Sequence, residues 1–267
     1  HSVVRRQRQM CIRDRFLAVL GVSLSAFTDE AEDGEELPTQ VFGYFTNGKL
    51  KKASRLPFEG HGFIKIARPR WRGYGSREMM HLIMNAAADV KDAFPEGERL
   101  QVADISQKKG GRISLHGSHQ NGLDVDTTYY RKNHWEQHPD RTSGFQEDFV
   151  IDGELSDNFD LERNWFFVKA LHAHGDINRI LMDNVIKAAM CELARERGEY
   201  EETIEVLRSL RHWRNHSDHY HIRLKCPEGN ENCRDQREPP EGSGCPEVEG
   251  EEREDGDDAD SGDSEGS

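Results

Sequence analysis

The sequence lacks two features that would point to common classes of binding protein. It carries a formal net charge of −14 over 267 residues, which gives no electrostatic case for binding a phosphate backbone, because that needs a clustered lysine and arginine surface. It also lacks an apolar run of the roughly 20 residues that a membrane-spanning helix needs. We therefore expect no nucleic-acid partner and no membrane span in the mature chain. The sequence does not indicate an oligomeric state.

The acidic excess is concentrated at one end of the chain. Residues 246–267 hold eleven acidic side chains against one arginine, which accounts for −10 of the net charge. Their Glu, Asp, Gly and Ser composition has almost nothing to bury, so we expect a disordered acidic tail. The rest is only mildly acidic, and its length suits one catalytic domain, which we predict at residues 38–245.

The first residues have the pattern of an export signal. Residues 1–15 are basic and do not read as part of a fold, so we set them aside as non-native sequence or as a basic leader. Residues 16–26 form a short apolar run that ends in small side chains and precedes an acidic linker. This arrangement is typical of the apolar region of a signal peptide and predicts an exported protein.

Cysteine is scarce, and its distribution is uneven. Cys11 would leave with the signal segment, and the other four lie in the last third of the chain at Cys191, Cys226, Cys233 and Cys245. An even number grouped around loop sequence with little apolar core predicts two disulfides and an oxidising compartment. Spacing alone does not determine their pairing.

Apolar periodicity predicts an α+β domain in which helices flank an antiparallel sheet. Short strands are expected in residues 38–69, 99–106 and 177–182. Helices are expected from Ser76 to Pro95, from Asp160, from Asp183 or Asn184 to Gly198, and through residues 204–210. The third of these helices is predicted to turn Val185, Ala189 and Leu193 inward.

Two short segments, residues 114–126 and 216–224, concentrate the chemistry. Together they offer five histidines and several carboxylates, which are ligand types that suit zinc. Side chains alternate along a strand, so Asp124 and Asp126 share one face, and His219, His221 and Arg223 share another. Each strand would then have an apolar back and a ligand-bearing front.

A catalytic zinc site uses three protein ligands and keeps one position open for water. His119, Asp126 and one histidine of the His219/His221 pair would supply the three ligands. The other histidine of that pair would then be placed to accept a proton from the water or to stabilise the charge that develops on the carbonyl oxygen.

The segments His119–Asp126 and His219–Pro227 resemble the penicillin-insensitive murein endopeptidase family. That family is similar to lysostaphin-type enzymes, D-alanyl-D-alanine metallopeptidases and the hedgehog domain. The resemblance implies a zinc site of that type in a periplasmic D,D-endopeptidase. Its substrate would be peptidoglycan, and it would hydrolyse D-alanyl-diaminopimelyl crosslinks.

The resemblance also implies roles for individual residues. His119, Asp126 and His221 match the zinc ligands, His219 matches the catalytic histidine, and His216 matches a supporting one. It pairs the four cysteines as Cys226 with Cys233 and Cys191 with Cys245.

This sequence departs from the family pattern at a second metal site. The family forms that site with the position of His116 and an Asp-x-x-His motif, but here the corresponding residues run from Asp152 to Leu155. One zinc is therefore expected, with His116 as an optional ligand of a second. Two other functions are compatible with the same residues: a D,D-carboxypeptidase, and a non-catalytic, zinc-stabilised domain that binds the cell wall.

Overall fold

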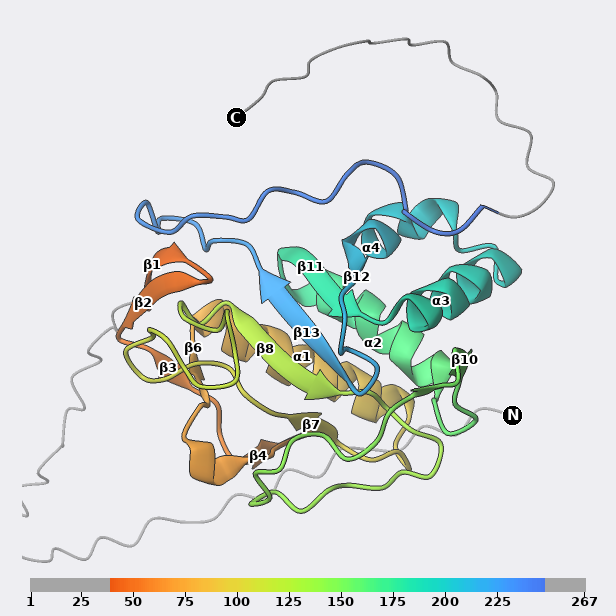
Figure 1. Ribbon diagram of the computed structural model, residues 1–267, viewed down its shortest axis with the longest axis horizontal. Coiled ribbons are helices and arrows are strands. Elements are labelled where there is room, and N and C mark those ends of the chain that lie inside the picture. Colours follow the sequence, from red (N-terminus) through yellow and green to blue (C-terminus); the bar gives the residue numbers. More distant parts are fainter. Residues whose placement is uncertain (1–38, 248–267) are drawn as a thin grey trace, which may run out of the picture. The chain divides into compact units, whose positions relative to one another are not determined.

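The computed structural model describes residues 39–247 (Figure 1). The predicted leader, signal segment and most of the acidic tail lie outside this range. A seven-stranded sheet forms the centre of the described part, in the order β12-β11-β13-β8-β7-β5-β4. Its strands are β4 (Glu59–Gly60), β5 (Phe63–Lys65), β7 (Leu100–Val102), β8 (Asp124–Thr128), β11 (Ile177–Met182), β12 (Leu210–His212) and β13 (His219–Leu224).

The prediction of an α+β fold is confirmed, but the sheet is mixed rather than antiparallel. The central pairs β11/β13, β13/β8 and β8/β7 are antiparallel, whereas β5/β7 and β11/β12 are parallel. Each parallel pair is joined through helices: α1 follows β5, and α3 and α4 follow β11. A crossover helix of this kind is the usual way to bring a second strand back in the same direction.

Three small two-stranded ladders complete the strand content of the described residues. They are β1 (Gln40–Tyr44) with β2 (Asn47–Lys51), β3 (Ser54–Arg55) with β6 (Tyr74–Gly75), and β9 (Val150–Ile151) with β10 (Glu154–Leu155). The region between β8 and α2 is otherwise largely irregular.

The helices begin where the sequence predicts. Ser76 caps α1 (Arg77–Ala93) by accepting the N–H of Met79, and Asp160 caps α2 (Leu161–His174) by accepting the N–H of Arg163. Asp183 caps α3 in the same way. The remaining helical segments are α3 (Asn184–Glu196), α4 (Ile204–Ser209) and two 3-10 turns, Arg68–Arg70 and Glu201–Thr203.

The predicted inward face of α3 is wrong at Val185 and Ala189, whereas Leu193 is buried as predicted. Ile186 and Met190 are fully buried, whereas Val185 and Ala189 are only partly buried. The helix packs against β12, α2 and α4, and these contacts select the stripe that also carries Cys191. Several adjacent stripes of this helix are apolar, so periodicity alone does not choose between them.

The hydrophobic core lies on the helix-covered side of the sheet. Figure 1 shows α1 behind β8 and β13, and α1 packs closely against α2. Val125 of β8 and Tyr220, Ile222 and Leu224 of β13 point into this core and are almost fully buried. The predicted alternation of both strands is confirmed, and it leaves their opposite faces to polar side chains.

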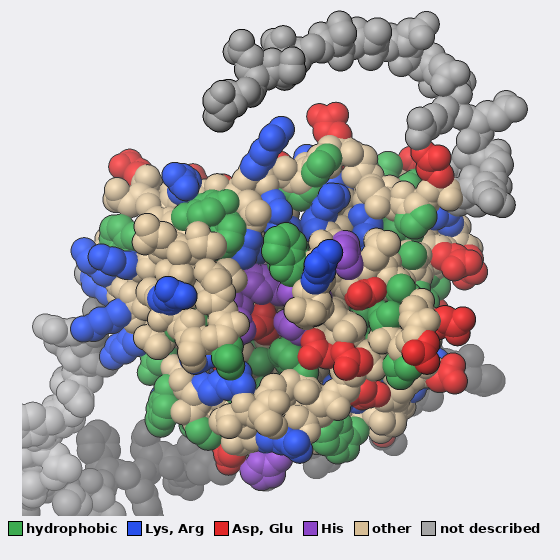
Figure 2. Space-filling model, in the orientation of Figure 1, with side chains coloured by type: hydrophobic (Ala, Val, Ile, Leu, Met, Phe, Trp, Pro, Cys, Tyr) green, Lys and Arg blue, Asp and Glu red, His purple; other side chains and the backbone are tan. Residues whose placement is uncertain are grey.

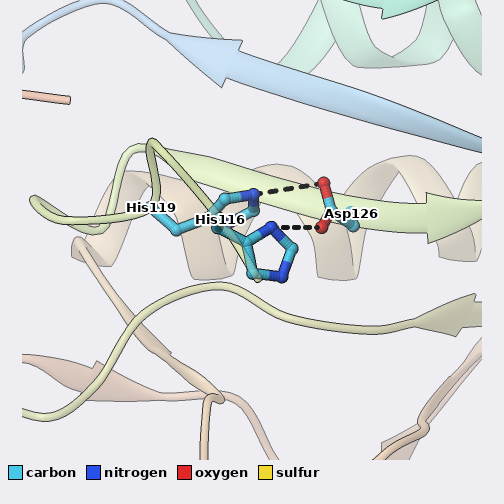
Figure 3. Close-up of side chains that lie close together, drawn as sticks. All are labelled: His116, His119 and Asp126. Carbon is cyan, nitrogen blue, oxygen red and sulfur yellow. Dashed lines mark ion pairs between the residues drawn. The ribbon is translucent and has the colours of Figure 1, made fainter. Parts of the chain in front are cut away.

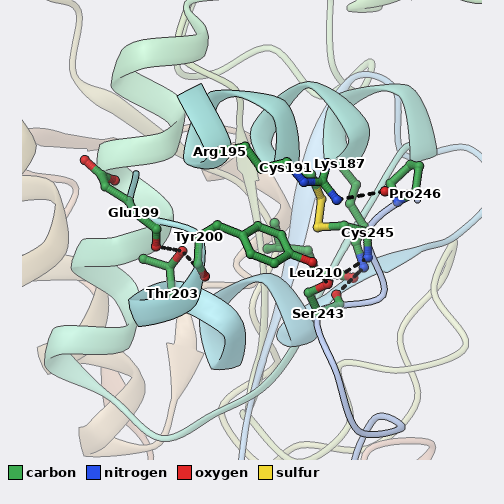
Figure 4. Close-up of a disulfide and its surroundings, with 10 residues drawn as sticks. All are labelled: Lys187, Cys191, Arg195, Glu199, Tyr200, Thr203, Leu210, Ser243, Cys245 and Pro246. Atoms are coloured by element: carbon green, nitrogen blue, oxygen red, sulfur yellow. Dashed lines mark hydrogen bonds between the residues drawn. A yellow bond between two sulfur atoms is a disulfide. The ribbon is translucent and has the colours of Figure 1, made fainter. Parts of the chain in front are cut away.

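Two disulfides stabilise the C-terminal segment: one closes a short loop within it, and the other ties its end to α3. Cys191 of α3 bonds Cys245 (Figure 4), and Cys226 bonds Cys233, the pairing that the resemblance implied. Beside the second bridge, the Lys187 ammonium donates to the carbonyls of Leu210 and Ser243, each at 2.9 Å. Among residues 39–247, no helix is long and apolar enough to cross a membrane.

Candidate metal centre and active-site cleft

The two ligand-bearing segments are neighbours at the centre of the sheet. Strands β8 and β13 pair antiparallel, with His221 opposite Asp126 and Arg223 opposite Asp124. Residues opposite each other on adjacent strands point to the same face. Two segments separated by about 90 residues of sequence therefore present their histidines and carboxylates together.

His119 reaches the site from the loop before β8. Its backbone has a φ of 62°, an unusual value for a residue other than glycine, and Asp124 Oδ2 accepts its N–H at 3.1 Å. The chain then turns at Gly122, where φ is 75° and an added Cβ would lie 2.6 Å from Leu50. This turn brings the fully buried His119 ring alongside Asp126.

The tautomer of His119 follows from its surroundings. Nδ1 lies 2.8 Å from the carbonyl oxygen of Ile105, so it carries the proton that this acceptor requires. Nε2 then presents a lone pair 3.2 Å from Asp126 Oδ1. Both of these atoms are buried, and neither has a hydrogen-bond partner among the described residues.

His221 faces the same oxygen from β13. Its Nε2 lies 2.9 Å from Asp124 Oδ1, and its Nδ1 lies 3.1 Å from Asp126 Oδ1. Burial disfavours the imidazolium, but Asp124 and then Asp126 outweigh it and raise the pKa of His221 above its ordinary value. Without an ion, these two carboxylates favour a proton on the ring; a bound cation would take the place of that proton.

Asp124 holds the neighbouring side chains in place through hydrogen bonds. Besides His221 and the N–H of His119, it accepts the Arg223 guanidinium at 2.6 Å. Burial opposes ionisation of this carboxyl, but the charges of Arg223 and His221 outweigh it and hold its pKa well below the usual range. Asp124 therefore stays a carboxylate that orients ligands, as a metal site requires of its supporting groups.

His116 lies on the other side of Asp126. Figure 3 shows His116 and His119 turned toward the Asp126 carboxylate, with His116 Nδ1 3.6 Å from Oδ2. Its Nε2 is 3.0 Å from Asp104 Oδ2. That same oxygen accepts Arg70 and Arg72 at 2.9 Å each.

The Asp104 carboxylate is thereby held ionised. Its burial opposes this, but the hydrogen bond from His116 and the two arginines lower its pKa to about 2. The His116 ring is thus fixed with Nε2 donating and Nδ1 free toward Asp126.

His219 and His216 stand at the open side of the site. The Nδ1–H of His219 donates to the Asp218 carboxylate, and its Nε2 is 4.0 Å from Asp126 Oδ1. The His219 ring stacks on Phe145 and on His216, at 4.4 and 4.6 Å between ring centroids. The Nδ1–H of His216 donates to the Arg214 carbonyl at 2.8 Å, and burial followed by the charge of His219 lowers the pKa of His216 to about 4.

The donor set fits a divalent metal ion. Each of the five rings has one nitrogen committed to a protein oxygen, which leaves the other as a lone-pair donor. His116, His119 and Asp126 offer ligand atoms within 4.8 Å of one another. His221 is the alternative third ligand, because its Nδ1 approaches the same Asp126 oxygen as His119, whereas His116 approaches the other.

The site opens into a cleft of about 450 Å³. Figure 2 shows the histidines and a carboxylate at the bottom of a hollow, with apolar and basic side chains around them. The cleft is lined by His116, Asp126, His216, His219 and His221 together with Phe45, Leu115, Arg179, Trp213, Arg214 and Arg223, among others. Leu115 and Trp213 are largely exposed at its edge.

The structure thus brings together every candidate ligand and catalytic histidine of the sequence analysis. It does not bring Asp152 to them: that residue lies in the exposed turn between β9 and β10. Asp104 and Asp218 are partners of histidines that the sequence did not single out. Asp218 adjoins His219, so adjacency was a usable signal, but nothing local links Asp104 to His116.

The chain belongs to the penicillin-insensitive murein endopeptidase family, whose family model matches residues 41–255. Two similar proteins bear the name penicillin-insensitive murein endopeptidase. The one from Haemophilus influenzae is 31% identical, over 80% of this chain and 72% of its own length. The one from Pectobacterium atrosepticum is 30% identical, over 77% of this chain and 72% of its own length.

Proposed function

We propose that this protein is an exported zinc D,D-endopeptidase that hydrolyses D-alanyl-diaminopimelyl crosslinks in peptidoglycan. The observation that carries the proposal is the convergence of His119 Nε2 and His221 Nδ1 on Asp126 Oδ1, at 3.2 and 3.1 Å, beside a free nitrogen of His219. Membership of the murein endopeptidase family supports the choice of substrate.

The proposed organisation follows from the same arguments. Residues 38–245 form the peptidase domain, with a zinc site like that of D-alanyl-D-alanine peptidases and hedgehog domains. Residues 16–26 direct export to the periplasm, where the two disulfides can form. Zinc is held by His119, Asp126 and His221, and His116 is available to a second ion or as a further ligand.

A bound zinc ion supplies Lewis acidity, which makes a water molecule acidic near neutral pH and polarises an amide carbonyl. His219 Nε2 faces this region and accepts the proton of the attacking water. Asp218 accepts the Nδ1–H of His219 and so stabilises the imidazolium that forms. The ring then returns the proton to the departing amine.

The neighbouring side chains hold His219 in place for this task. Stacking on Phe145 and His216 fixes the plane of its ring. The lowered pKa of His216 keeps that second ring neutral, so it does not add a positive charge beside the developing imidazolium.

Two variants test the assignment, with purified crosslinked muropeptide dimers as substrate. His219→Ala is expected to keep wild-type zinc content and lose about 10²- to 10⁴-fold in kcat. His221→Ala is expected to lose the zinc itself. His81→Ala, on the exposed side of α1, is the matched control and keeps both.

Each outcome discriminates between the candidate functions. If His219→Ala cleaves dimers at the wild-type rate, His219 is not the base. Release of terminal alanine without monomers from dimers identifies a carboxypeptidase. Zinc-loaded protein that binds sacculi and cleaves neither bond identifies a binding domain. If His221→Ala retains zinc and His116→Ala loses it, the third zinc ligand is His116 rather than His221.

A further inference from the structure

One side of the cleft is basic, although the protein as a whole is acidic. Arg179 of β11 pairs across the sheet with Arg223 of β13, and Leu181 pairs with His221. Arg179 therefore lies on the same face as the histidines, about 7 Å along the strands from His221. It lines the same cleft as His219 and His221, as does Arg214.

These two arginines differ from their neighbour Arg223 in having no carboxylate partner. Arg223 is neutralised by Asp124 at 2.6 Å. Within residues 39–247, neither Arg179 nor Arg214 lies within ion-pair distance of an acidic side chain. Cationic groups at the edge of a cleft with no countercharge favour the binding of an anion.

Hydrogen bonds hold the Arg179 side chain in place but do not use all of its N–H donors. Its Nε donates to Asn178 Oδ1 at 2.8 Å, and its Nη2 donates to the carbonyl of Arg237. Its Nη1 has no acceptor among the described residues. The guanidinium is thus pre-positioned by two contacts and retains a donor for a ligand, which lowers the entropy cost of binding.

The charged surroundings of Arg179 are mainly repulsive. Burial, and then the positive charges of Arg223 and Arg211, lower its pKa. Glu238 acts in the opposite direction but is already paired with Lys225 at 3.0 Å. Glu241 lies farther along the adjoining C-terminal segment, outside the cleft. An anion at this position would relieve the repulsion.

The proposed substrate carries an anion at the required place. Diaminopimelate is an α-amino acid at both ends, so the carbon that bears the crosslinking amine also bears a carboxylate. That carboxylate is one carbon away from the nitrogen of the scissile amide. A guanidinium recognises such a group through paired N–H donors.

We propose that Arg179, assisted by Arg214, binds the carboxylate on the carbon next to the scissile amide nitrogen. Arg179 thereby makes the enzyme specific for crosslinks whose carboxylate is free rather than amidated. This inference rests on the proposed function and names the determinant of its specificity.

The test compares two crosslinked dimers that differ only at this group, one with the free acid and one with the primary amide. Wild-type protein is expected to favour the acid by about 10- to 100-fold in kcat/KM. Arg179→Gln should cut the acid no faster than wild type cuts the amide. Arg77→Gln makes the same charge change at the start of α1 and should retain full discrimination.

A binding measurement separates this inference from the proposed function. Calorimetric titration with the diaminopimelyl tripeptide, as acid and as amide, should show about tenfold tighter binding of the acid to wild type and no difference for Arg179→Gln. Wild-type protein that shows this preference but cleaves neither dimer overturns the proposed function and keeps the carboxylate site. Equal affinity for acid and amide, or an equal loss for both in Arg179→Gln, overturns the carboxylate site.

Discussion

The centres of the two faces of strands β8 and β13 are both buried, yet they have opposite chemistry. Val125 and Ile222 on the back are fully buried among apolar side chains, and Asp124 and Asp126 on the front are buried to the same degree. Burial of apolar groups stabilises the fold, whereas burial of charge costs free energy unless each group is paired. Packing of the apolar back face therefore stabilises the fold and offsets the free-energy cost of burying the polar groups on the front face.

The largest effect on this contrast is expected from removing the carboxylate that supports the front face. Asp124→Ala would leave the buried Arg223 without its countercharge and His221 without its acceptor. We expect a loss of about 3 to 5 kcal/mol in the free energy of unfolding. Zinc affinity should fall by about 10- to 100-fold.

Urea denaturation and competitive metal titration measure the two effects. Asp124→Asn is the matched control, because it keeps the shape and one acceptor oxygen and should lose less in both. If Asp124→Ala unfolds like wild type, the front face is not held by this carboxylate.

The second test weakens only the back face. Ile222→Ala creates a cavity in the core and should cost about 2 to 5 kcal/mol of unfolding free energy, measured by urea denaturation. At 10 °C, where the variant is still folded, its zinc stoichiometry should equal that of wild type. A loss of zinc from folded Ile222→Ala would show that the two faces are not separable.

The smallest expected effect comes from a titratable group in the helices that cover the sheet. His172 lies near the end of α2, where its ring contacts Ser209 Oγ at 2.8 Å, and burial lowers its pKa to about 4. Between pH 6.5 and about 4, the unfolded chain therefore binds a proton at this position that the folded chain does not. Stability should fall as the pH is lowered through that window.

His172→Gln removes this titration and should give a shallower decline in unfolding free energy over the same window. The readout is the set of urea midpoints from pH 4 to 7, with the exposed His81→Gln as control. An unchanged slope in His172→Gln would show that His172 does not contribute to the acid sensitivity.

Local sequence patterns predicted much of this molecule, and long-range contacts account for the rest. The caps at Ser76 and Asp160 and the alternation in β13 depend on residues close in sequence, so they were readable. The parallel pairing of β5 with β7 and the choice of the buried face of α3 depend on contacts between segments distant in sequence. The periodicity of a single sequence does not predict such contacts.

The site shows the same division. His119 and Asp126 were predicted as ligands from one short segment, in which they lie seven residues apart with Gly122 between them. The link from His116 through Asp104 to Arg70 and Arg72 was not, because these residues belong to separate segments that meet only in the fold. The arginine side of the cleft likewise depends on strand β11 lying next to β13.

The adjacency of β8 and β13 has a consequence for how the protein is assembled. Asp124 and His221 touch across a separation of 97 positions in the chain. Bringing the ends of so long a segment together costs conformational entropy. Contacts within either strand do not offset this cost before the two strands pair. If His221 is the third ligand, as proposed, an ion would bind only to chains in which this loop has closed, and a zinc titration would also count the fully folded molecules in a preparation.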